Sequence, residues 1–270
     1  MARSAAERAG VAVREVQAMD DLRLACRLLA DVWGTDEQHL LAPELARALT
    51  HAGSYLAVAE SLAGGSPQGV LTGFLGTRDG EFYLHSHVLG VLPPLRHTGI
   101  GFALKLHQRA WALQRGIRLI AWTFDPLVAR NGYFNVTKLG GEVVSYYVNF
   151  YGPMSDAINR GDESDRALLA WRLDGPRLES PAAAGGDPGP VLAVGADGGP
   201  QRRPAPPPGS TVACHVPPDI DAIRARRPDL AMRWRRALRE VLGGALAEGR
   251  RVSGMTRDGR YLLTPPSGGA

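Results

Sequence analysis

The chain of 270 residues is long enough for one large domain or two small ones. Its hydrophobic share of 44% predicts a sizeable core, and its charged share of 21% excludes a chain that is disordered throughout. The net charge of +4 is unevenly spread, because residues 1–175 hold 17 basic and 18 acidic groups whereas residues 176–270 hold 14 and 9. The excess positive charge therefore belongs to the last third of the chain.

The cysteine content and the N-terminal sequence indicate which cellular compartment to expect. Two cysteines, Cys26 and Cys214, exclude a disulfide framework and a cysteine-rich zinc site. The first ten residues carry charges where a signal peptide needs an apolar core, and no apolar run approaches the ~20 residues that cross a bilayer. We therefore expect a soluble cytoplasmic protein with no membrane partner.

The first third of the chain predicts a strand, two helices and a meander. Residues 1–10 are small and polar, so we expect them to be disordered. Alternation predicts a strand at residues 11–16, Asp20 caps a predicted helix, and Pro43 starts a second, short helix. Turn sequences then separate three predicted strands, at residues 55–60, 70–77 and 81–91. Two turn-linked pairs in a row favour antiparallel pairing.

The pattern changes after residue 91. Residues 99–115 have helical spacing and end at Gly116, and residues 119–123 form a short apolar strand. A crossover of this length favours parallel pairing of the strands on either side. Further strands are predicted at residues 143–151 and 167–173. The expected fold class is therefore α/β (α+β), with a central mixed, mostly antiparallel sheet flanked by helices within residues 11–175.

Composition separates a C-terminal extension from this core. Sixteen of the 35 residues from 176 to 210 are Gly or Pro, which indicates a linker or surface loop, although a brief strand at residues 191–194 stays open. Residues 211–264 predict a strand at 211–216, a largely helical stretch at 219–248 with a break at Pro228, and a hairpin around Asp258-Gly259. We expect this strand–helix–hairpin extension to dock on the main domain.

The most informative segment joins the third meander strand to the next helix. Pro93 and Pro94 cannot donate to a ladder, and Arg96-His97-Thr98-Gly99-Ile100-Gly101 leads directly into the helix. The free N–H groups and dipole of a helix N-terminus favour an anion, glycines allow its close approach, and an arginine adds a cation. A tight strand–helix turn without a ligand is the alternative. The lysine of a P-loop and the third glycine of a dinucleotide fingerprint are missing.

This Arg-x-x-Gly-x-Gly segment resembles the acyl-CoA pyrophosphate motif of the GNAT acyltransferase superfamily, and the order of predicted elements is similar to that fold. Longer words at residues 84–87 (LHSH), 122–127 (WTFDPL), 131–140 and 164–166 (SDR) resemble an uncharacterised bacterial group of predicted GNAT acetyltransferases. The resemblance implies a GNAT-type three-layer fold over residues 11–175, with acetyl-CoA or another acyl-CoA as cosubstrate and no metal.

The resemblance also implies which residues bind CoA. In that superfamily the fourth and fifth strands splay apart and pantetheine lies between them. Leu89 and Val91 would flank the pantetheine arm, and Asn131 is similar to an asparagine that binds this arm. The backbone N–H groups of six consecutive residues would hold the pyrophosphate: Arg96, His97, Thr98, Gly99, Ile100 and Gly101.

Candidate catalytic groups lie on the predicted strand at residues 81–91. A period of two places Glu81, Tyr83, His85 and His87 on one face. An imidazole with an ordinary pKa of about 6.5 suits proton transfer near neutrality. By resemblance, the position that often holds a carboxylate base holds His85, with His87 and Glu81 as alternates. Purely structural hydrogen bonding is the alternative, and a His-x-His metal site lacks a clear third ligand.

The resemblance leaves the general acid open. The superfamily's usual tyrosine corresponds to Val136, which cannot donate a proton. Tyr133 and Asn135 are within about one helical turn, and either could substitute. Asp125, which precedes Pro126, is expected either to cap a helix or to attract a cationic amine.

The basic tail invites a nucleic-acid interpretation. Its apolar stripe, which includes Leu230 and Trp234, leaves most arginines on the other side of the helix, where we expect them to be solvated. No zinc-finger spacing, RNA-binding signature or convincing helix-turn-helix accompanies them. The arginines in this stretch are Arg224, Arg226, Arg227, Arg233, Arg235, Arg236 and Arg239.

These observations favour an enzyme, an acyl-CoA-dependent N-acyltransferase. It would transfer acetyl from acetyl-CoA to a small-molecule or peptide amine by direct attack in a ternary complex. The first alternative is a non-catalytic acyl-CoA-binding or regulatory module, and the second is nucleic-acid binding through the basic tail. The sequence leaves the oligomeric state open, a homodimer included.

Overall fold

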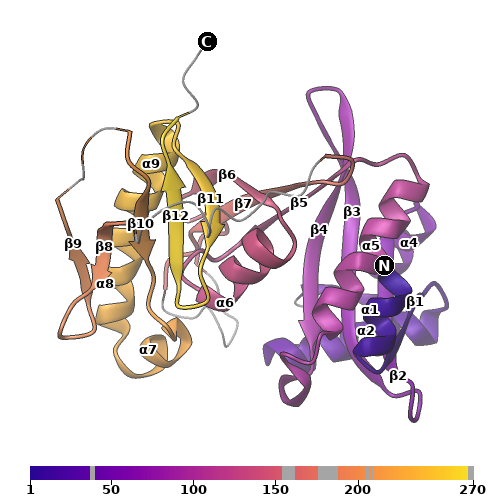
Figure 1. The fold of residues 1–270 in the computed structure, drawn as a ribbon. Coiled ribbons are helices and arrows are strands. Elements are labelled where there is room, and N and C mark those ends of the chain that lie inside the picture. Colours follow the sequence, from indigo (N-terminus) through magenta and orange to yellow (C-terminus); the bar gives the residue numbers. More distant parts are fainter. Residues whose placement is uncertain (37–39, 154–161, 176–187, 205–206, 208, 267–270) are drawn as a thin grey trace. The chain divides into compact units, whose positions relative to one another are not determined.

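A computed structural model describes residues 1–36, 40–153, 162–175, 188–204, 207 and 209–266. The chain divides into two compact units (Figure 1). Unit 1 contains Met1–Trp122 and Arg172–Asp174, and unit 2 contains Thr123–Ser155, Asn159–Trp171 and Gly175–Ala270.

Unit 1 is built on a mixed sheet with the strand order β1-β2-β3-β4-β5. All neighbours pair antiparallel except β4 and β5, which are parallel. Leu173 extends this order beyond β5, because its N–H donates to Arg118 O at 2.9 Å. The strands are β1 (Val11–Glu15), β2 (Tyr55–Ser61), β3 (Pro67–Arg78), β4 (Glu81–Val91) and β5 (Leu119–Phe124), whose last two residues belong to unit 2.

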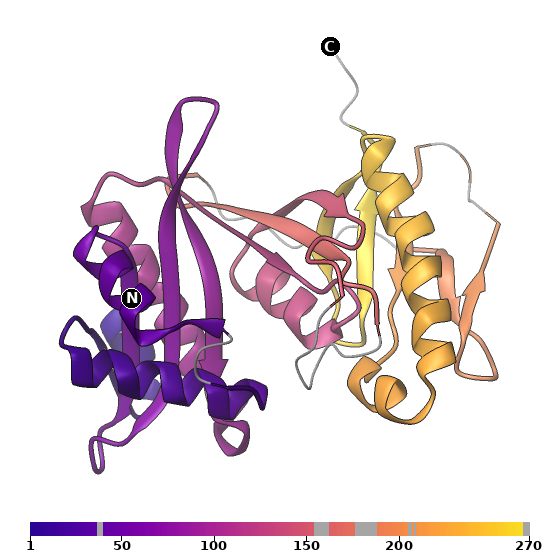
Figure 2. The same cartoon turned by 180° about the vertical axis from the view of Figure 1, so that it is seen from behind.

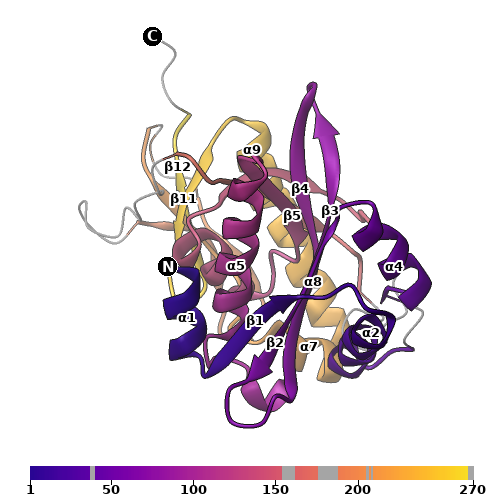
Figure 3. The same ribbon diagram turned by 90° about the vertical axis from the view of Figure 1, so that its right-hand side faces the viewer.

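Helices cover both faces of this sheet (Figure 3). Gly69 on β3 faces α5, since an added Cβ would lie 2.9 Å from Ile100 Cγ2. Gly90 on β4 faces α2, since an added Cβ would lie 3.2 Å from Leu29 Cδ2. One face therefore carries α1 and α5 and the other carries α2 and α4, which confirms the expected mixed sheet flanked by helices. The helices are α1 (Ala2–Arg8), α2 (Met19–Trp33), α4 (Pro43–His51) and α5 (Ile100–Gln114).

The N-terminal segment differs from the disorder expected for residues 1–10. Residues 2–8 form helix α1, which packs against α5 and buries Ala5. Alanine has the highest helix propensity, and its small side chain permits close packing. The methyl group of Ala9 would lie 3.6 Å from a Cβ added at Gly99, so the segment ends beside the start of α5.

Unit 2 combines the helix and strands after β5 with the C-terminal extension. In it β6 (Glu142–Tyr147) pairs antiparallel with β7 (Arg166–Arg172). A second sheet has the order β11-β12-β10-β8-β9, and α8 packs beside β9 (Figure 2). Its strands are β8 (Pro190–Val194), β9 (Pro200–Arg202), β10 (Val212–His215), β11 (Arg251–Met255) and β12 (Arg260–Thr264). The helices are α6 (Ala129–Gly132), which continues as the π-helix η2 (Tyr133–Lys138), then α7 (Ile220–Arg226), α8 (Pro228–Leu238), η3 (Arg239–Gly243) and α9 (Gly244–Ala247).

The division between the units lies after Trp122, not near residue 175 where composition changes. The helical segment after β5 packs with the extension, because Tyr261 Oη donates to Pro126 O at 2.9 Å and Thr137 Oγ1 donates to Met255 O at 2.6 Å. Strands β8 and β9 also occupy part of the expected linker. Glycine and proline mark turns, whereas packing between distant segments decides which of them form one unit.

Three further observations concern the cysteines, membrane-spanning helices and possible metal ligands. Cys26 and Cys214 are both buried, and neither forms a disulfide within the described part of the chain. Across the residues that the structure describes, no helix has the length and apolar character needed to cross a membrane. Across the same residues, no group of three or more His, Cys, Asp or Glu side chains is placed to hold a metal ion.

Candidate functional site

A β-bulge interrupts the middle of β4. Thr72 lies opposite Val88 and Gly73 lies opposite Ser86, so His87 is an extra residue without a partner on β3. Before the bulge, Ser86 faces α5, and after it Leu89 faces α5 as well, 3.6 Å from a Cβ added at Gly101. The regular alternation predicted along this strand therefore changes phase at His87.

The two histidines of β4 form an aromatic cluster with a neighbour on β3. The Phe74 ring stacks on His85 at 4.9 Å between centroids and lies 5.5 Å from His87, and the two imidazoles are 6.0 Å apart. Glu81 lies at the exposed hairpin end, four residues from His85, or roughly 13 Å along the strand. The structure brings His85 and His87 together and leaves Glu81 outside the cluster.

The environment of His85 keeps its imidazole neutral. Burial, followed by the nearby His87 and Lys105, lowers the pKa of His85 to about 4. Its ring nitrogens have no hydrogen-bond partner within the described part of the chain. The ring is therefore a free proton acceptor at neutral pH, although a weak one.

Strands β4 and β5 separate soon after they meet. They pair only at Leu84–Ile120 and His85–Ala121, although β4 continues to Val91. No strand among the described residues pairs with this edge of β4 beyond His85. The open edge exposes backbone donors and acceptors that an extended ligand with amide groups can pair with.

A loop with free N–H groups follows the open edge directly. After the short 3-10 helix η1 (Pro93–Leu95), Gly99 adopts the left-handed region at φ 99°. Thr98 Oγ1 fixes the loop by donating to Leu95 O at 2.7 Å. The N–H groups of Thr98, Gly99, Ile100 and Gly101 find no acceptor among the described residues. We refer to residues 98–101 as the anion site, because four N–H groups without an acceptor at the start of a 15-residue helix favour a negatively charged ligand.

The expected CoA-binding residues of unit 1 therefore form one continuous path. Leu89 and Val91 lie below the first turn of α5, 3.6 Å and 3.9 Å from a Cβ added at Gly101. Arg96 and His97 are exposed beside the free N–H groups, and His97 has a positive φ of 72°. The path runs from the open edge of β4 to the anion site without leaving unit 1.

Two other predicted residues belong to unit 2. Asn131 is exposed, and its N–H donates to Val128 O at 2.9 Å. Tyr133 Oη accepts a hydrogen bond from Arg257 Nε at 3.1 Å. Val136, at the position of the expected acid, is buried with 3% exposure.

Asp125 has both a capping role and an ionic role. Its Oδ1 accepts the Leu127 N–H at 2.9 Å, as expected for a cap, and Arg235 binds both carboxylate oxygens at 2.7 Å and 2.9 Å. Burial opposes ionisation, but the guanidinium groups of Arg235 and Arg224 hold the pKa of Asp125 well below its usual range. The carboxylate is satisfied within the chain, so it is not free to attract an amine.

Three arginines of the tail are likewise not solvated as expected. The side chains of Arg235 and Arg224 are only 1% and 7% exposed and bind Asp125 and Asp162. Arg239 binds Asp165 at 2.8 Å and also contacts Glu163. These arginines lie outside the apolar stripe of the helix, as expected, but they form ion pairs with carboxylates that are distant in sequence.

Among the buried ionisable side chains that sequence reasoning missed, Lys105 on α5 lies nearest the candidate site. Its Nζ donates to Ser86 Oγ at 2.8 Å and lies 3.5 Å from the centroid of the Trp122 ring. The residue is 3% exposed. A single lysine beside apolar positions is not distinguished in sequence from one that faces solvent.

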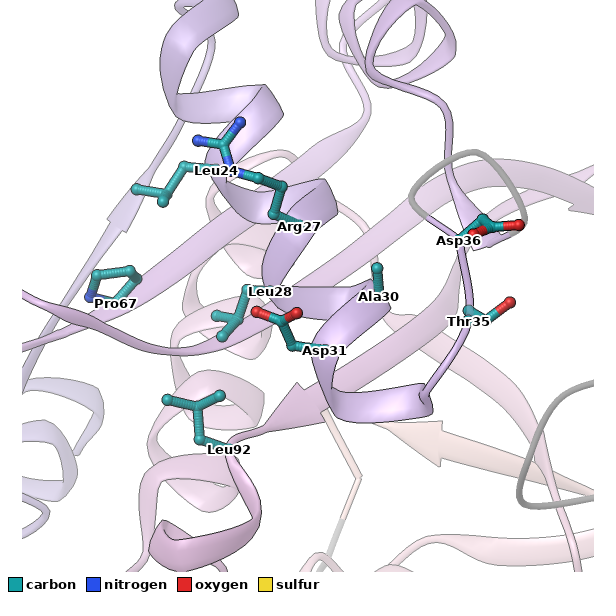
Figure 4. A pocket seen from close by; sticks show the side chains of 9 residues that line it. All are labelled: Leu24, Arg27, Leu28, Ala30, Asp31, Thr35, Asp36, Pro67 and Leu92. Carbon is teal, nitrogen blue, oxygen red and sulfur yellow. The ribbon is translucent and has the colours of Figure 1, made fainter.

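An open pocket of about 420 Å³ lies elsewhere on unit 1, along α2 (Figure 4). Helix α2 supplies Leu28 and Asp31, the segment after it supplies Asp36, and Pro67 and Leu92 complete part of the wall. None of the predicted site residues lines it, although Leu92 follows Val91 directly.

No family model matches the sequence, and no curated protein matches it. Solved structures with a similar fold include a putative GNAT acetyltransferase from Desulfovibrio desulfuricans, which is 16% identical, covers 60% of this chain and 99% of its own, and has a TM-score of 0.46. A GNAT family acetyltransferase from Elizabethkingia anophelis with acetyl-CoA bound is 14% identical over 60% and 98% of the two chains, with a TM-score of 0.45. A ribosomal-protein alanine N-acetyltransferase from Escherichia coli is 13% identical over 62% and 96%, with a TM-score of 0.49.

Proposed function

We propose that the chain is an acyl-CoA-dependent N-acyltransferase that transfers acetyl from acetyl-CoA to an amine by direct attack. One observation carries the proposal: the open edge of β4 beyond His85 leads directly to the four free N–H groups of residues 98–101. CoA presents a pyrophosphate followed by an arm with amide groups. The anion site and the open edge would bind these two parts in that order.

The histidine cluster supports the chemical step. The attacking amine must be neutral, so a base or a bound water must take its proton. His85 is neutral above about pH 4 and has no competing hydrogen bond among the described residues. It would accept this proton directly or through water, with His87 beside it as the alternate. Backbone N–H groups of the open edge would stabilise the oxyanion of the tetrahedral intermediate.

A non-catalytic acyl-CoA-binding module is the second candidate, and a specific observation favours it. The position of the expected acid holds the buried Val136, and the hydroxyl of Tyr133 is bound to Arg257. Binding of CoA would then occur without turnover. Nucleic-acid binding through the tail loses support, because Arg224, Arg235 and Arg239 are occupied by carboxylates.

One experiment separates these functions. The protein is heated with and without CoA, and thiol release from acetyl-CoA is followed with a polyamine, a peptide with an N-terminal alanine and an aminoglycoside. The last two are chosen because similar folds are named as a ribosomal-protein alanine acetyltransferase and an aminoglycoside acetyltransferase. Stabilisation with turnover supports the enzyme, stabilisation without turnover supports the binding module, and no stabilisation contradicts both.

A further inference from the structure

The amine of Lys105 lies at the point where β4 and β5 separate. The last residues paired between the strands are His85 and Ala121, so Ser86 and Trp122 are the next residue on each side. Lys105 Nζ contacts both: it donates to Ser86 Oγ at 2.8 Å and lies 3.5 Å from the Trp122 ring centroid. All of these residues belong to unit 1.

This amine is buried without an opposite charge. No ion pair joins Lys105 to any described carboxylate, and the residue is 3% exposed. Buried lysines are rare unless they are paired, because desolvation of an ammonium is costly. Burial lowers the pKa of Lys105 well below its usual value, while the face of the Trp122 ring stabilises the ammonium form. A lowered pKa makes the ammonium of Lys105 a stronger proton donor than that of an exposed lysine.

Helix α5 begins at the anion site and also carries Lys105. Helix α5 runs back along β4, so Gly101 lies over Leu89 and Val91, and Lys105 lies over Ser86. From Val91 to Ser86 the strand covers roughly 16 Å. A ligand held by its pyrophosphate at the start of α5, with its arm along β4, would bring the far end of the arm toward Lys105.

We propose that Lys105 is the acid that protonates the CoA sulfur as it leaves. This inference rests on the proposed acyltransferase function. The acceptor nitrogen forms a bond to the acyl carbon, the carbon–sulfur bond breaks, and its electron pair stays on sulfur. The sulfur takes a proton from the Lys105 ammonium, and the neutral amine regains one from solvent. The proton that the acceptor nitrogen loses goes to His85 or to water, so CoA leaves as a thiol.

The thiol of bound CoA provides a direct test that needs no acceptor. In the full-length protein, the ultraviolet absorbance of the thiolate is followed against pH, with S-methyl-CoA as the blank. The Lys105 ammonium would stabilise the thiolate, so we expect the thiol pKa of bound CoA to lie below that of free CoA. Lys105→Met keeps the side-chain length without the charge. In this variant we expect the thiol pKa of bound CoA to equal or exceed that of free CoA.

Gln108→Met is the matched control. Gln108 is about one turn further along α5 and fully buried, and neither side-chain amide atom has a hydrogen-bond partner among the described residues. Its replacement should leave the thiol pKa unchanged. With an acceptor that is turned over, Lys105→Met should slow release of CoA by about 10²-fold or more. With an activated aryl thioester, whose thiolate leaves without a proton, Lys105→Met should reduce the rate much less.

The outcomes separate the two proposals. If the wild-type protein does not bind CoA, the proposed function fails. If it binds CoA and the thiol pKa is the same in wild type and Lys105→Met, Lys105 is not the acid although the function stands. If Lys105→Met does not fold, Lys105→Gln is measured in the same way, and an unchanged thiol pKa in it would equally overturn the assignment.

Discussion

The two units bury ionisable side chains in opposite ways. In unit 2, Arg224 and Arg235 are enclosed together with Asp125 and Asp162, so each of these four buried charges has a partner of opposite sign. In unit 1, the amine of Lys105 is enclosed with a hydroxyl and an indole, and His85 has no described hydrogen-bond partner. A buried ion pair holds distant segments of the chain together. A buried ionisable group without an opposite charge instead has a shifted pKa and can exchange a proton.

The largest expected effect concerns the paired arginines of unit 2. Arg235→Met leaves two buried carboxylates without their main partner, so we expect the free energy of unfolding to fall by about 3–5 kcal/mol in denaturant titrations. Arg233→Met is the matched control, because this arginine is 52% exposed and pairs with the exposed Asp197. Its effect should stay within about 0.5 kcal/mol. Equal losses in the two variants would end the distinction between buried and exposed pairs.

The next effect concerns the unpaired imidazole of unit 1. His85→Gln removes the proposed proton acceptor, so we expect kcat/KM to fall by about 10²- to 10⁴-fold with the acceptor identified by thiol release. CoA binding, measured by heat stabilisation, should remain. His87→Gln tests the alternate group on the same strand. Full activity in His85→Gln together with loss in His87→Gln would move the role to His87.

The anion site should respond to charge. Gly101→Asp places a carboxylate beside the free N–H groups, where an added Cβ meets only ordinary contacts of 3.6 Å and 3.9 Å. We expect at least tenfold weaker CoA binding by calorimetry, because the new charge repels the pyrophosphate and competes for its donors. Gly64→Asp makes the same change in an open turn and should bind CoA as the wild type does.

The smallest effect is a pH dependence of stability. The pKa of His85 is about 4 in the folded protein and ordinarily 6.5, so the unfolded chain takes up this proton first as the pH falls. His85 therefore reduces the free energy of unfolding progressively from about pH 6.5 to about pH 4. His85→Gln should lose less stability than wild type between pH 7 and pH 5 in urea titrations. A larger loss in the variant would contradict a neutral, half-buried imidazole.

The elements around the candidate site follow well from sequence. The strand predicted at residues 81–91 is β4 with the same bounds, and the helix predicted from residue 99 begins at Ile100. Both rest on local signals: alternation bounded by turn residues, and glycines before a helical repeat. The bulge at His87 gives no such signal, since no Gly or Pro marks it and it depends on the register with β3.

The buried charges do not follow from sequence, for a related reason. Asp125 and Arg235 are 110 residues apart, and nothing local to either predicts the pair. Lys105 lies next to the buried Leu104 on the predicted helix, at the margin of the apolar stripe, where a lysine can equally face water. Periodicity identifies which face of an element is apolar, but it does not show which partners a polar residue will meet.

The bulge at His87 has a consequence for how such a protein can diversify. Because the side chains change phase there, one strand presents the imidazoles of His85 and His87 before the change, and Leu89 and Val91 below α5 after it. Under the proposed function, the residues near the acceptor amine and those that contact the cosubstrate are adjacent in sequence. Either set can nevertheless be substituted without altering the other. Substitutions near residues 85–87 could alter acceptor preference during evolution while the donor site, made largely of backbone, is inherited unchanged.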